Sequence, residues 1–338
     1  MSMVRRLPEL LVPALLVLGT ALLGLAVSSY LQAYFIDTLV KVAIVVALYV
    51  FVGNSGVVSF GHIAFVALGA WTAGVLTVPP DQKTAIMPGL AHFLVHTNVG
   101  NVTSLALAAG VGAAFALLVG LPLMRLSGLA AGIATFAVLE ITNNVLTNTP
   151  AIGPGSNAFS SVPQTTGIWQ ATIGALICIV VAFGYRSSRF GRMLGATRED
   201  PAAAAATGIS IYRQRLLAFA ISGGLAGLAG GIYIHFLPLQ AGELYLDLTF
   251  ITLAMLVVGG SSTLLGAVIG ALAVSGIYSF FSAATNTVDV FGWHLTVPQG
   301  TAEIVLGVLM AFVLIVRPSG LMGGRELTLP ERWIRRDA

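Results

Sequence analysis

Apolar runs of about 20 residues, separated by short polar stretches, recur along the whole chain. A helix crosses the hydrocarbon core of a bilayer in about 20 residues, because each residue adds about 1.5 Å. Backbone groups find no hydrogen-bond partner in lipid, so we expect these runs to be helical. The pattern predicts about ten transmembrane helices, at residues 10–28, 36–53, 61–78, 102–124, 128–147, 170–186, 214–236, 248–260, 264–282 and 299–316.

The composition agrees with this pattern. Of 338 residues, 57% are hydrophobic and 9% are charged, whereas soluble domains carry about 25% charged residues. We therefore expect an all-α polytopic membrane protein, in which residues 1–338 form a single membrane domain without a soluble ATPase domain. The net charge of +3 gives no indication of nucleic-acid binding. The chain has a single cysteine, Cys178, and no metal-ligand spacing, so we expect no disulfide, metal or cofactor.

The positions of the arginines predict the orientation. With the N-terminus inside and ten crossings, every arginine falls on one side, within residues 5–6, 125, 186–215 and 317–336. Cytoplasmic loops carry the excess of basic residues, so we expect both termini in the cytoplasm. The first apolar run is longer than a signal-peptide core of about 7–15 residues, and we expect it to remain as an anchor.

The longest polar segment, residues 187–213, is predicted to be the main cytoplasmic loop, and it carries helix signals. In "REDPAAAAATG", Asp200 and Pro201 are typical of an N-cap followed by the first helical residue. The alanines favour helix, and Gly208 stands where a left-handed glycine ends one. The segment either docks on a partner or is a solvated loop that sets topology. The candidate docking residues are Arg192, Arg198, Glu199, Asp200, Pro201, Ala204 and Gly208.

Polar residues inside the apolar runs are few, and such residues are functional candidates. They give a candidate substrate path of Ser59, His62, Phe65, Thr135, Glu140, Asn143 and Asn144. Glu140 either lines the path or makes a hydrogen bond between helices. Ser59 and His62 have a path or hinge role or a structural one. Asp37 and Lys41, four residues apart, are expected to form a local ion pair.

Glycines spaced four residues apart predict close packing between membrane helices. They are Gly223, Gly227 and Gly231 in one run, and Gly266 and Gly270 in another. Small residues at this spacing allow helix backbones to approach each other.

The chain lacks the chemistry needed to power or catalyse a reaction alone. The phosphate-binding pattern G-x-x-x-x-G-K-[ST] is absent from the sequence. No Ser/His/Asp or Cys/His set stands at an interpretable spacing, so we do not expect an enzyme. If the chain is a transporter, its energy comes from another subunit or from an ion gradient.

Six blocks in one order resemble a known family. The resemblance covers residues 50–323 approximately and is carried by "NSGVVSFGHIAFVALGAWTAGVL", "LSGLAAGIATFAVLEI", "GPGSNAF", "GRMLGATREDPAAAAATGISIYRQRLLAFAISGGLAGLAGGIY", "LAMLVVGGSSTLLGAVIGA" and "EIVLGVLMAFVLIVRPSGLMG". These blocks are similar to those of the M-type permease subunit of branched-chain amino acid ABC importers (LivM-type). The resemblance implies the ABC-importer permease fold, in which a short coupling helix of the cytoplasmic loop docks on an ATPase.

The resemblance also implies partners and a location. They are two ATP-binding ABC subunits, a second permease subunit forming a heterodimer, and an extracytoplasmic solute-binding protein, in a lipid-surrounded bacterial cytoplasmic membrane. Pro201 and Ala205 replace acidic residues of the family pattern, and Ala130 and Ala131 replace aromatic ones. The solute therefore stays open between a branched-chain or hydrophobic amino acid, another amino acid, and urea or a short amide. An ion-coupled secondary transporter is the alternative mechanism. It would need an ion site inside the membrane, and Glu140 alone does not make one.

Overall fold

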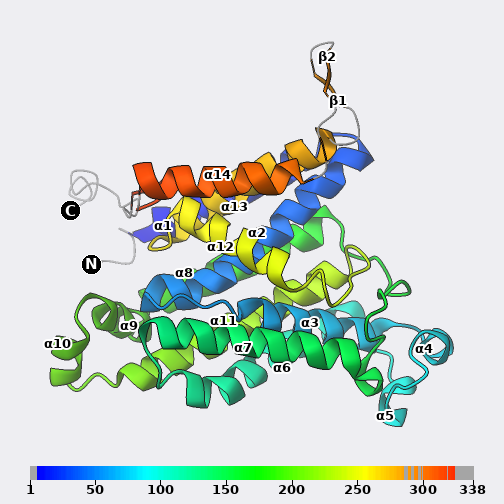
Figure 1. The fold of residues 1–338 in the computed structure, drawn as a ribbon, viewed down its shortest axis with the longest axis horizontal. Coiled ribbons are helices and arrows are strands. Elements are labelled where there is room, and N and C mark those ends of the chain that lie inside the picture. The colour runs from blue at the N-terminus through cyan, green and yellow to red at the C-terminus, as the bar shows by residue number, and fades with distance from the viewer. Residues whose placement is uncertain are drawn as a thin grey trace, which may run out of the picture.

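The computed structural model describes residues 6–284, 288–290, 293–295, 298, 300–317 and 319–323. Within them the chain is helical, apart from a small antiparallel hairpin of β1 (Val288–Val290) and β2 (Trp293–Leu295). The helices run between two ends of one bundle (Figure 1). We call them the α10 end, which carries α9 (Arg189–Glu199) and α10 (Pro201–Ala206), and the hairpin end, which carries the β-hairpin, α4 (Pro80–Ile86) and α5 (His92–Val95).

Seven of the described helices are long and apolar enough to cross a membrane. They are α1 (Leu7–Leu25), α2 (Ser29–Ser55), α6 (Asn101–Leu123), α7 (Gly128–Asn148), α8 (Ile168–Ser187), α11 (Ile211–Ile234) and α13 (Leu264–Ala284). Three shorter apolar helices are α3 (His62–Thr77), α12 (Leu246–Gly259) and α14 (Thr301–Val316). Each predicted run overlaps one of these helices. The protein is thus a multi-pass membrane protein, while the count of ten crossings stays a prediction.

One predicted boundary differs from the structure, and another agrees with it. Helix α2 begins at Ser29 rather than at residue 36, and its 27 residues extend over about 40 Å, more than the hydrocarbon core. Its first turns therefore continue past the apolar run. Helix α12 ends at Gly259, next to the predicted end of its apolar run at residue 260. Gly260 follows with φ +114°, a conformation that favours glycine, and α13 starts anew at Leu264.

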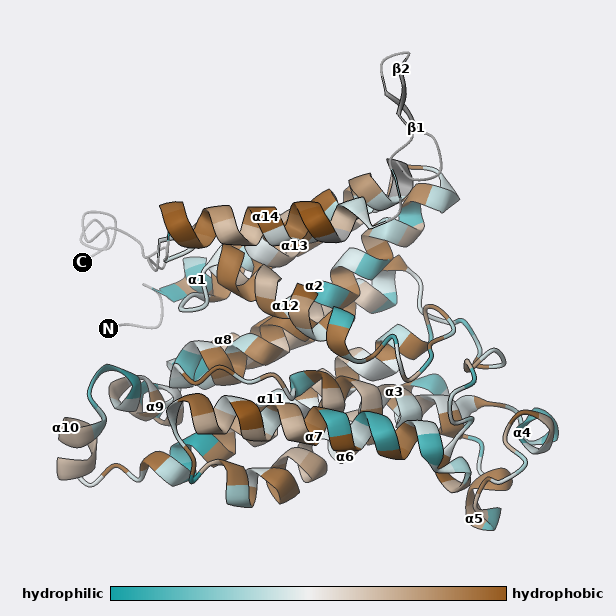
Figure 2. Ribbon diagram, in the orientation of Figure 1, coloured by the Kyte–Doolittle hydropathy of each residue, from teal (hydrophilic) through white to brown (hydrophobic). Residues whose placement is uncertain are grey.

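Helices α2 and α11 form the centre of the bundle. Every side chain of α2 from Leu39 to Val52 is buried, because α8, α11 and α13 pack around it. Helix α11 packs on α6, α3 and α2. Hydrophobic residues also cover the outer helices (Figure 2), as expected for helices that face lipid.

The described arginines gather at the α10 end. Arg6, Arg186, Arg192 and Arg198 line one polar depression there, and Arg125 stacks over the Tyr212 ring near the start of α11. Residues 319–323 also lie at this end, since the Leu321 amide donates to the Val258 carbonyl. This distribution is what the orientation hypothesis requires; the side of the membrane stays a prediction.

Candidate functional site

Helix α3 begins in the middle of the bundle, after the non-helical segment 56–61. His62 forms the first turn, and its Nε2 lies 2.7 Å from Ser222 Oγ, at the midpoint of α11. Ser222 Oγ donates to the Ala47 carbonyl at 2.6 Å. A hydroxyl has one hydrogen, so Ser222 accepts from His62 Nε2–H, and Nδ1 accepts from Ser59 Oγ at 2.8 Å. This buried chain of hydrogen bonds joins the start of α3 to α11 and α2.

Aromatic rings close the space around His62. Phe51 stacks on the imidazole, and Phe65 and Phe219 meet it edge to face. The side chains of Ser59, His62 and Phe65 are all buried. The first break (residues 56–61) is therefore closed around its polar residue Ser59, while Gly56 and Val58 are exposed. Ser59, His62 and Phe65 of the candidate path lie inside the packed interior.

Helix α7 has two polar faces. Thr135 is buried, and its Oγ1 accepts the Phe60 amide at 3.1 Å, which ties the segment before α3 to α7. Glu140 and Asn144 lie on the exposed face, followed one turn later by Asn148. Asn143 is half-buried, and among the described residues its Oδ1 has no hydrogen-bond partner. The candidate path residues thus separate into an interior set and an exposed stripe.

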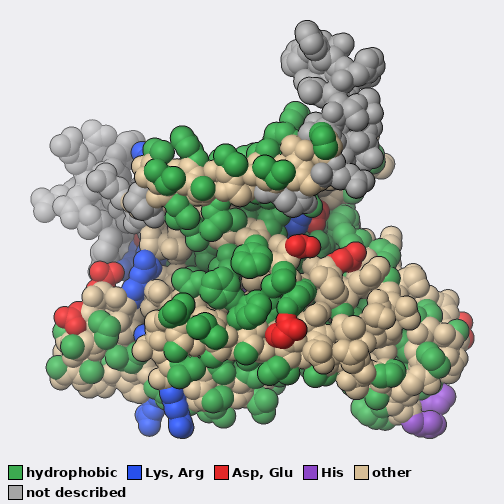
Figure 3. All heavy atoms as spheres, in the orientation of Figure 1, with side chains coloured by type: hydrophobic (Ala, Val, Ile, Leu, Met, Phe, Trp, Pro, Cys, Tyr) green, Lys and Arg blue, Asp and Glu red, His purple; other side chains and the backbone are tan. Residues whose placement is uncertain are grey.

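The exposed stripe of α7 meets the start of α12. The Tyr245 hydroxyl, at the N-cap of α12, donates to the Glu140 carboxylate. Helix α12 has 14 residues, about 21 Å, too short for a core of about 30 Å. The non-helical segment 235–245 precedes it. We call this segment the second break. In Figure 3, acidic side chains gather over α7 and the start of α12, and a basic side chain is recessed beneath α14.

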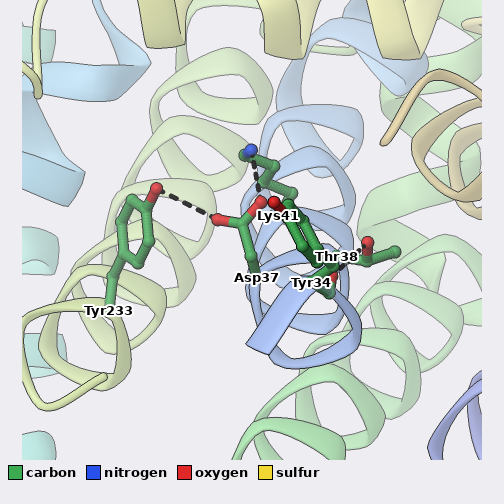
Figure 4. A network of polar contacts seen from close by, with 5 residues as sticks. All are labelled: Tyr34, Asp37, Thr38, Lys41 and Tyr233. Carbon is green, nitrogen blue, oxygen red and sulfur yellow. Dashed lines mark hydrogen bonds and ion pairs between the residues drawn. The ribbon is translucent and has the colours of Figure 1, made fainter. Parts of the chain in front are cut away.

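An ion pair lies beside this second break. Lys41 Nζ and Asp37 Oδ2 are 2.5 Å apart on α2, so the predicted pair is confirmed. Figure 4 shows that Tyr233 of α11 also points at the Asp37 carboxylate, to which its hydroxyl donates at 3.2 Å. Lys41 in turn lies over the Tyr278 ring of α13, with Nζ 5.1 Å from its centroid.

The loop predicted to dock folds into the two short helices α9 and α10. Ser188 Oγ caps α9 by accepting the Gly191 amide, and Asp200 Oδ1 caps α10 by accepting the Ala202 and Ala203 amides at 2.9 and 3.0 Å. Gly208 follows with φ +83°. Exposed polar side chains cover this region, among them Arg192, Glu199 and Asp200.

The α9–α10 pair is attached to the bundle at the end of α2. The Arg198 guanidinium donates to the Gly53 carbonyl. A Cβ on Gly56 would lie 3.0 Å from Arg198 Cγ, and Gly56 has φ +70°. Gly56 opens the first break, so the loop and the break share one anchoring point.

Ala204, one of the candidate docking residues, does not face a partner. Its side chain is buried against the chain itself, whereas Ala202, Ala203, Ala205 and Ala206 are exposed. With about 3.6 residues per turn, Ala202 lies nearly opposite Ala204. A surface offered to a partner therefore consists of the other alanines.

The glycines of α11 lie where helix backbones meet. A Cβ on Gly227 would collide with the Ala108 carbonyl of α6, and one on Gly223 would lie 2.9 Å from the Gly112 carbonyl. Gly231 approaches Leu105 and Ala108. Gly266 and Gly270 face Gly259 and Gly260, at the tight turn between α12 and α13.

Sequence reasoning missed several polar residues. Ser222 stands among glycines, and its partner His62 is 160 residues away. Tyr245, Glu243 and Asp247 lie between two predicted apolar runs, 214–236 and 248–260, and were not among the candidate residues. The signal that identifies them is the combination of a short apolar run and two acids close before it.

Comparison with known proteins identifies relatives. The family of the branched-chain amino acid transport system / permease component matches residues 30–314. The high-affinity branched-chain amino acid transport system permease protein LivM of Escherichia coli is 26% identical over 337 residues, covering 89% of this chain and 71% of that protein. LivM of Salmonella typhimurium is 26% identical over 84% of this chain and 68% of that protein.

Other relatives match a smaller part. The autoinducer 2 import system permease protein LsrC of Klebsiella pneumoniae is 31% identical over 47% of this chain and 46% of that protein. No solved structure matches the chain.

Proposed function

The chain belongs to the family of branched-chain amino acid transport permeases, and we propose that it translocates an apolar amino acid as one permease subunit of an ABC importer. Two separate ATP-binding subunits dock at the α10 end, which faces the cytoplasm. A second permease subunit lies against the exposed face of α7. A solute-binding protein delivers the solute at the hairpin end.

The observation that carries this proposal is the connection between the exposed loop and the interior. Arg198 holds α9–α10 to Gly53, three residues before the first break. Across that break, Phe60 is bonded to Thr135 on α7, and His62 is linked to Ser222 on α11. A force on α10 therefore reaches three central helices through short hydrogen-bonded steps. Such a contiguous connection suits alternating access driven by the ATPases.

The exposed stripe of α7 is the proposed wall of the path. Glu140, Asn144 and Asn148 follow one another on one face, and polar groups are costly where a helix faces lipid. A second permease subunit on this face would enclose them. The fold of this family is compatible with more than one solute. The partial likeness to LsrC makes a small polar solute other than an amino acid the second candidate.

The test is Ala202→Glu in the complete importer reconstituted in proteoliposomes with its solute-binding protein. Ala202 is exposed, and an acid in the first turn of a helix is favourable, so the permease should fold. Burying an unpaired charge costs at least about 3 kcal/mol, so ATPase co-purification and ATP-driven L-leucine uptake should fall at least tenfold.

The matched control is Arg189→Glu, also exposed and on α9. A charge outside the buried contact is worth about 1 kcal/mol or less, so uptake should fall no more than fivefold or so. Normal uptake by Ala202→Glu with its ATPase bound would mean that the alanines are a solvated loop. Uptake that follows an ion gradient without ATP would favour the secondary transporter.

A further inference from the structure

A cavity of about 430 Å³ opens beside the second break, between α2, α11, α12, α13 and α14. This volume is within the range of about 300–1,000 Å³ that is usual for small-molecule sites. Its polar wall is formed by Lys41, Tyr233, Glu243, Asp247 and Tyr278. Its apolar wall is formed by Phe250, Ile251, Ala254, Leu306 and Met310.

The polar wall carries more carboxylates than it neutralises. Lys41 is already paired with Asp37. Glu243 accepts its own loop's Gln240 amide at 3.0 Å, and no cation among the described residues lies within ion-pair distance of Glu243 or Asp247. Asp247 stands in the first turn of α12. The wall is therefore suited to receive an ammonium group.

The same wall offers a cation to a carboxylate. An ammonium has three N–H donors, and Asp37 takes one of those of Lys41. The Lys41 side chain is buried, so a carboxylate that reaches it is bound in a medium of low dielectric constant, where charge-assisted hydrogen bonds are strong. The wall thus presents a cation, Lys41, and two acids, Glu243 and Asp247, and these match the two charges of a zwitterion.

The apolar wall defines the rest of the ligand. Phe250 is exposed on α12 and contributes its ring to the cavity, opposite Leu306 and Met310 of α14. These side chains would enclose a branched aliphatic group and exclude water from it. Glycine would leave this wall empty, and a charged side chain would meet it without a partner.

We propose that this cavity binds an amino-acid zwitterion with an aliphatic side chain: Asp247 and Glu243 receive the ammonium, Lys41 the carboxylate, and Phe250 with α14 the side chain. The inference rests on the proposed function and assigns its solute to one place in this chain. Tyr245, which contacts Glu140 of the stripe on α7, lies in sequence between the cavity residues Glu243 and Asp247.

The test measures direct binding of tritiated L-leucine to the complete importer in nanodiscs, without the solute-binding protein. Asp247→Asn should weaken binding at least about tenfold, as expected for loss of one charge-assisted contact. Asp81→Asn, an exposed acid of α4, should leave affinity within twofold or so. Phe250→Ala should weaken binding of leucine and leave that of glycine unchanged.

Two competitors test the zwitterion itself. Isoamylamine lacks the carboxylate and isocaproate lacks the ammonium, so each should compete at least about tenfold less well than leucine. Equal competition by the amine would make this a cation site and overturn the proposal. Absence of leucine binding, or an Asp247→Asn variant that binds within twofold, would also overturn it.

Two further measurements on the same preparations, with the solute-binding protein added, are ATP-driven uptake and ATPase co-purification. They distinguish a failure of the cavity assignment from a failure of the proposed function. If the wild-type importer takes up leucine while Asp247→Asn binds and imports normally, only the cavity assignment fails. If the wild-type chain neither retains an ATPase nor imports any of the solutes, the proposed function fails.

Discussion

The two breaks, before α3 and before α12, both interrupt the helices of the bundle, but their polar groups lie in opposite environments. Each places a short apolar helix after a non-helical segment, at residues 56–61 and 235–245. The first is closed: Ser59, His62 and Ser222 satisfy one another inside aromatic rings. The second is open: Glu243 and Asp247 are exposed at a cavity. Non-helical backbone at membrane depth is tolerated only when it is enclosed by protein or lines a wet cavity.

This difference assigns structural support to the first break and ligand recognition to the second. A polar group without a partner in a closed site destabilises the fold, so the closed break uses each of its groups for structure. In the open break no cation of the described part of the chain pairs with the carboxylates, which is costly in a membrane unless a ligand or water receives them. Substitutions in the closed break should therefore affect stability, and substitutions in the open break should affect transport.

The largest effect is expected for Gly230→Val. Gly230 packs against α3, and a Cβ there would lie 2.8 Å from the Val66 carbonyl carbon and 3.0 Å from the Ala70 amide nitrogen. Both are backbone atoms, so α3 and α11 must separate, at a cost of about 3 kcal/mol or more. We expect loss of folded protein, measured by size-exclusion chromatography of detergent extracts.

The matched control is Gly242→Ala, in the segment before α12, where an added Cβ has nothing within 4 Å. Its free energy of unfolding should change by about 0.5 kcal/mol or less. Equal loss of folded protein in both variants would show that the segment before α12 is packed as tightly as the contact between α3 and α11.

The next effect is expected for His62→Ala. The substitution removes a buried ring and leaves the Ser59 hydroxyl without its partner, so about 2–4 kcal/mol of stability should be lost. Asp247→Ala, in the open break, should cost about 0.5 kcal/mol or less, because its side chain is exposed. Heating series read by size-exclusion chromatography measure both. A more damaging Asp247→Ala would reverse the assignment of closed and open.

Much of the fold could be predicted because lipid imposes a simple rule. Apolar runs located the helices, and Asp200, Pro201 and Gly208 located α10 through local cap chemistry. The start of α2 was missed, since a helix longer than the bilayer carries polar turns beyond it.

The site was less predictable because its contacts are long-range. Lys41 and Asp37 lie four residues apart, so helix spacing was enough to pair them. The partners Glu140 and Tyr245 are 105 residues apart, and Phe60 and Thr135 are 75 apart. The burial of Ala204 could not be predicted because a run of identical alanines has no amphipathic pattern to orient it.

The smallest effect on stability, and the one that decides the role of the exposed stripe, is expected for Glu140→Gln. The amide keeps an acceptor for the Tyr245 hydroxyl, so the free energy of unfolding should change by about 0.5 kcal/mol or less. Removal of the charge should nevertheless lower leucine uptake severalfold, because the carboxylate faces the proposed path. Asp81→Asn is the control for loss of an exposed acid elsewhere.

Tyr245→Phe separates the charge of Glu140 from its contact with α12. This variant keeps the carboxylate and removes the bond that joins α7 to the start of α12. If Glu140 lines the path, Tyr245→Phe should reduce uptake less than Glu140→Gln does. If Tyr245→Phe is the more damaging and Glu140→Gln transports normally, then Glu140 is a tether between helices, and the open break receives its solute without the stripe on α7.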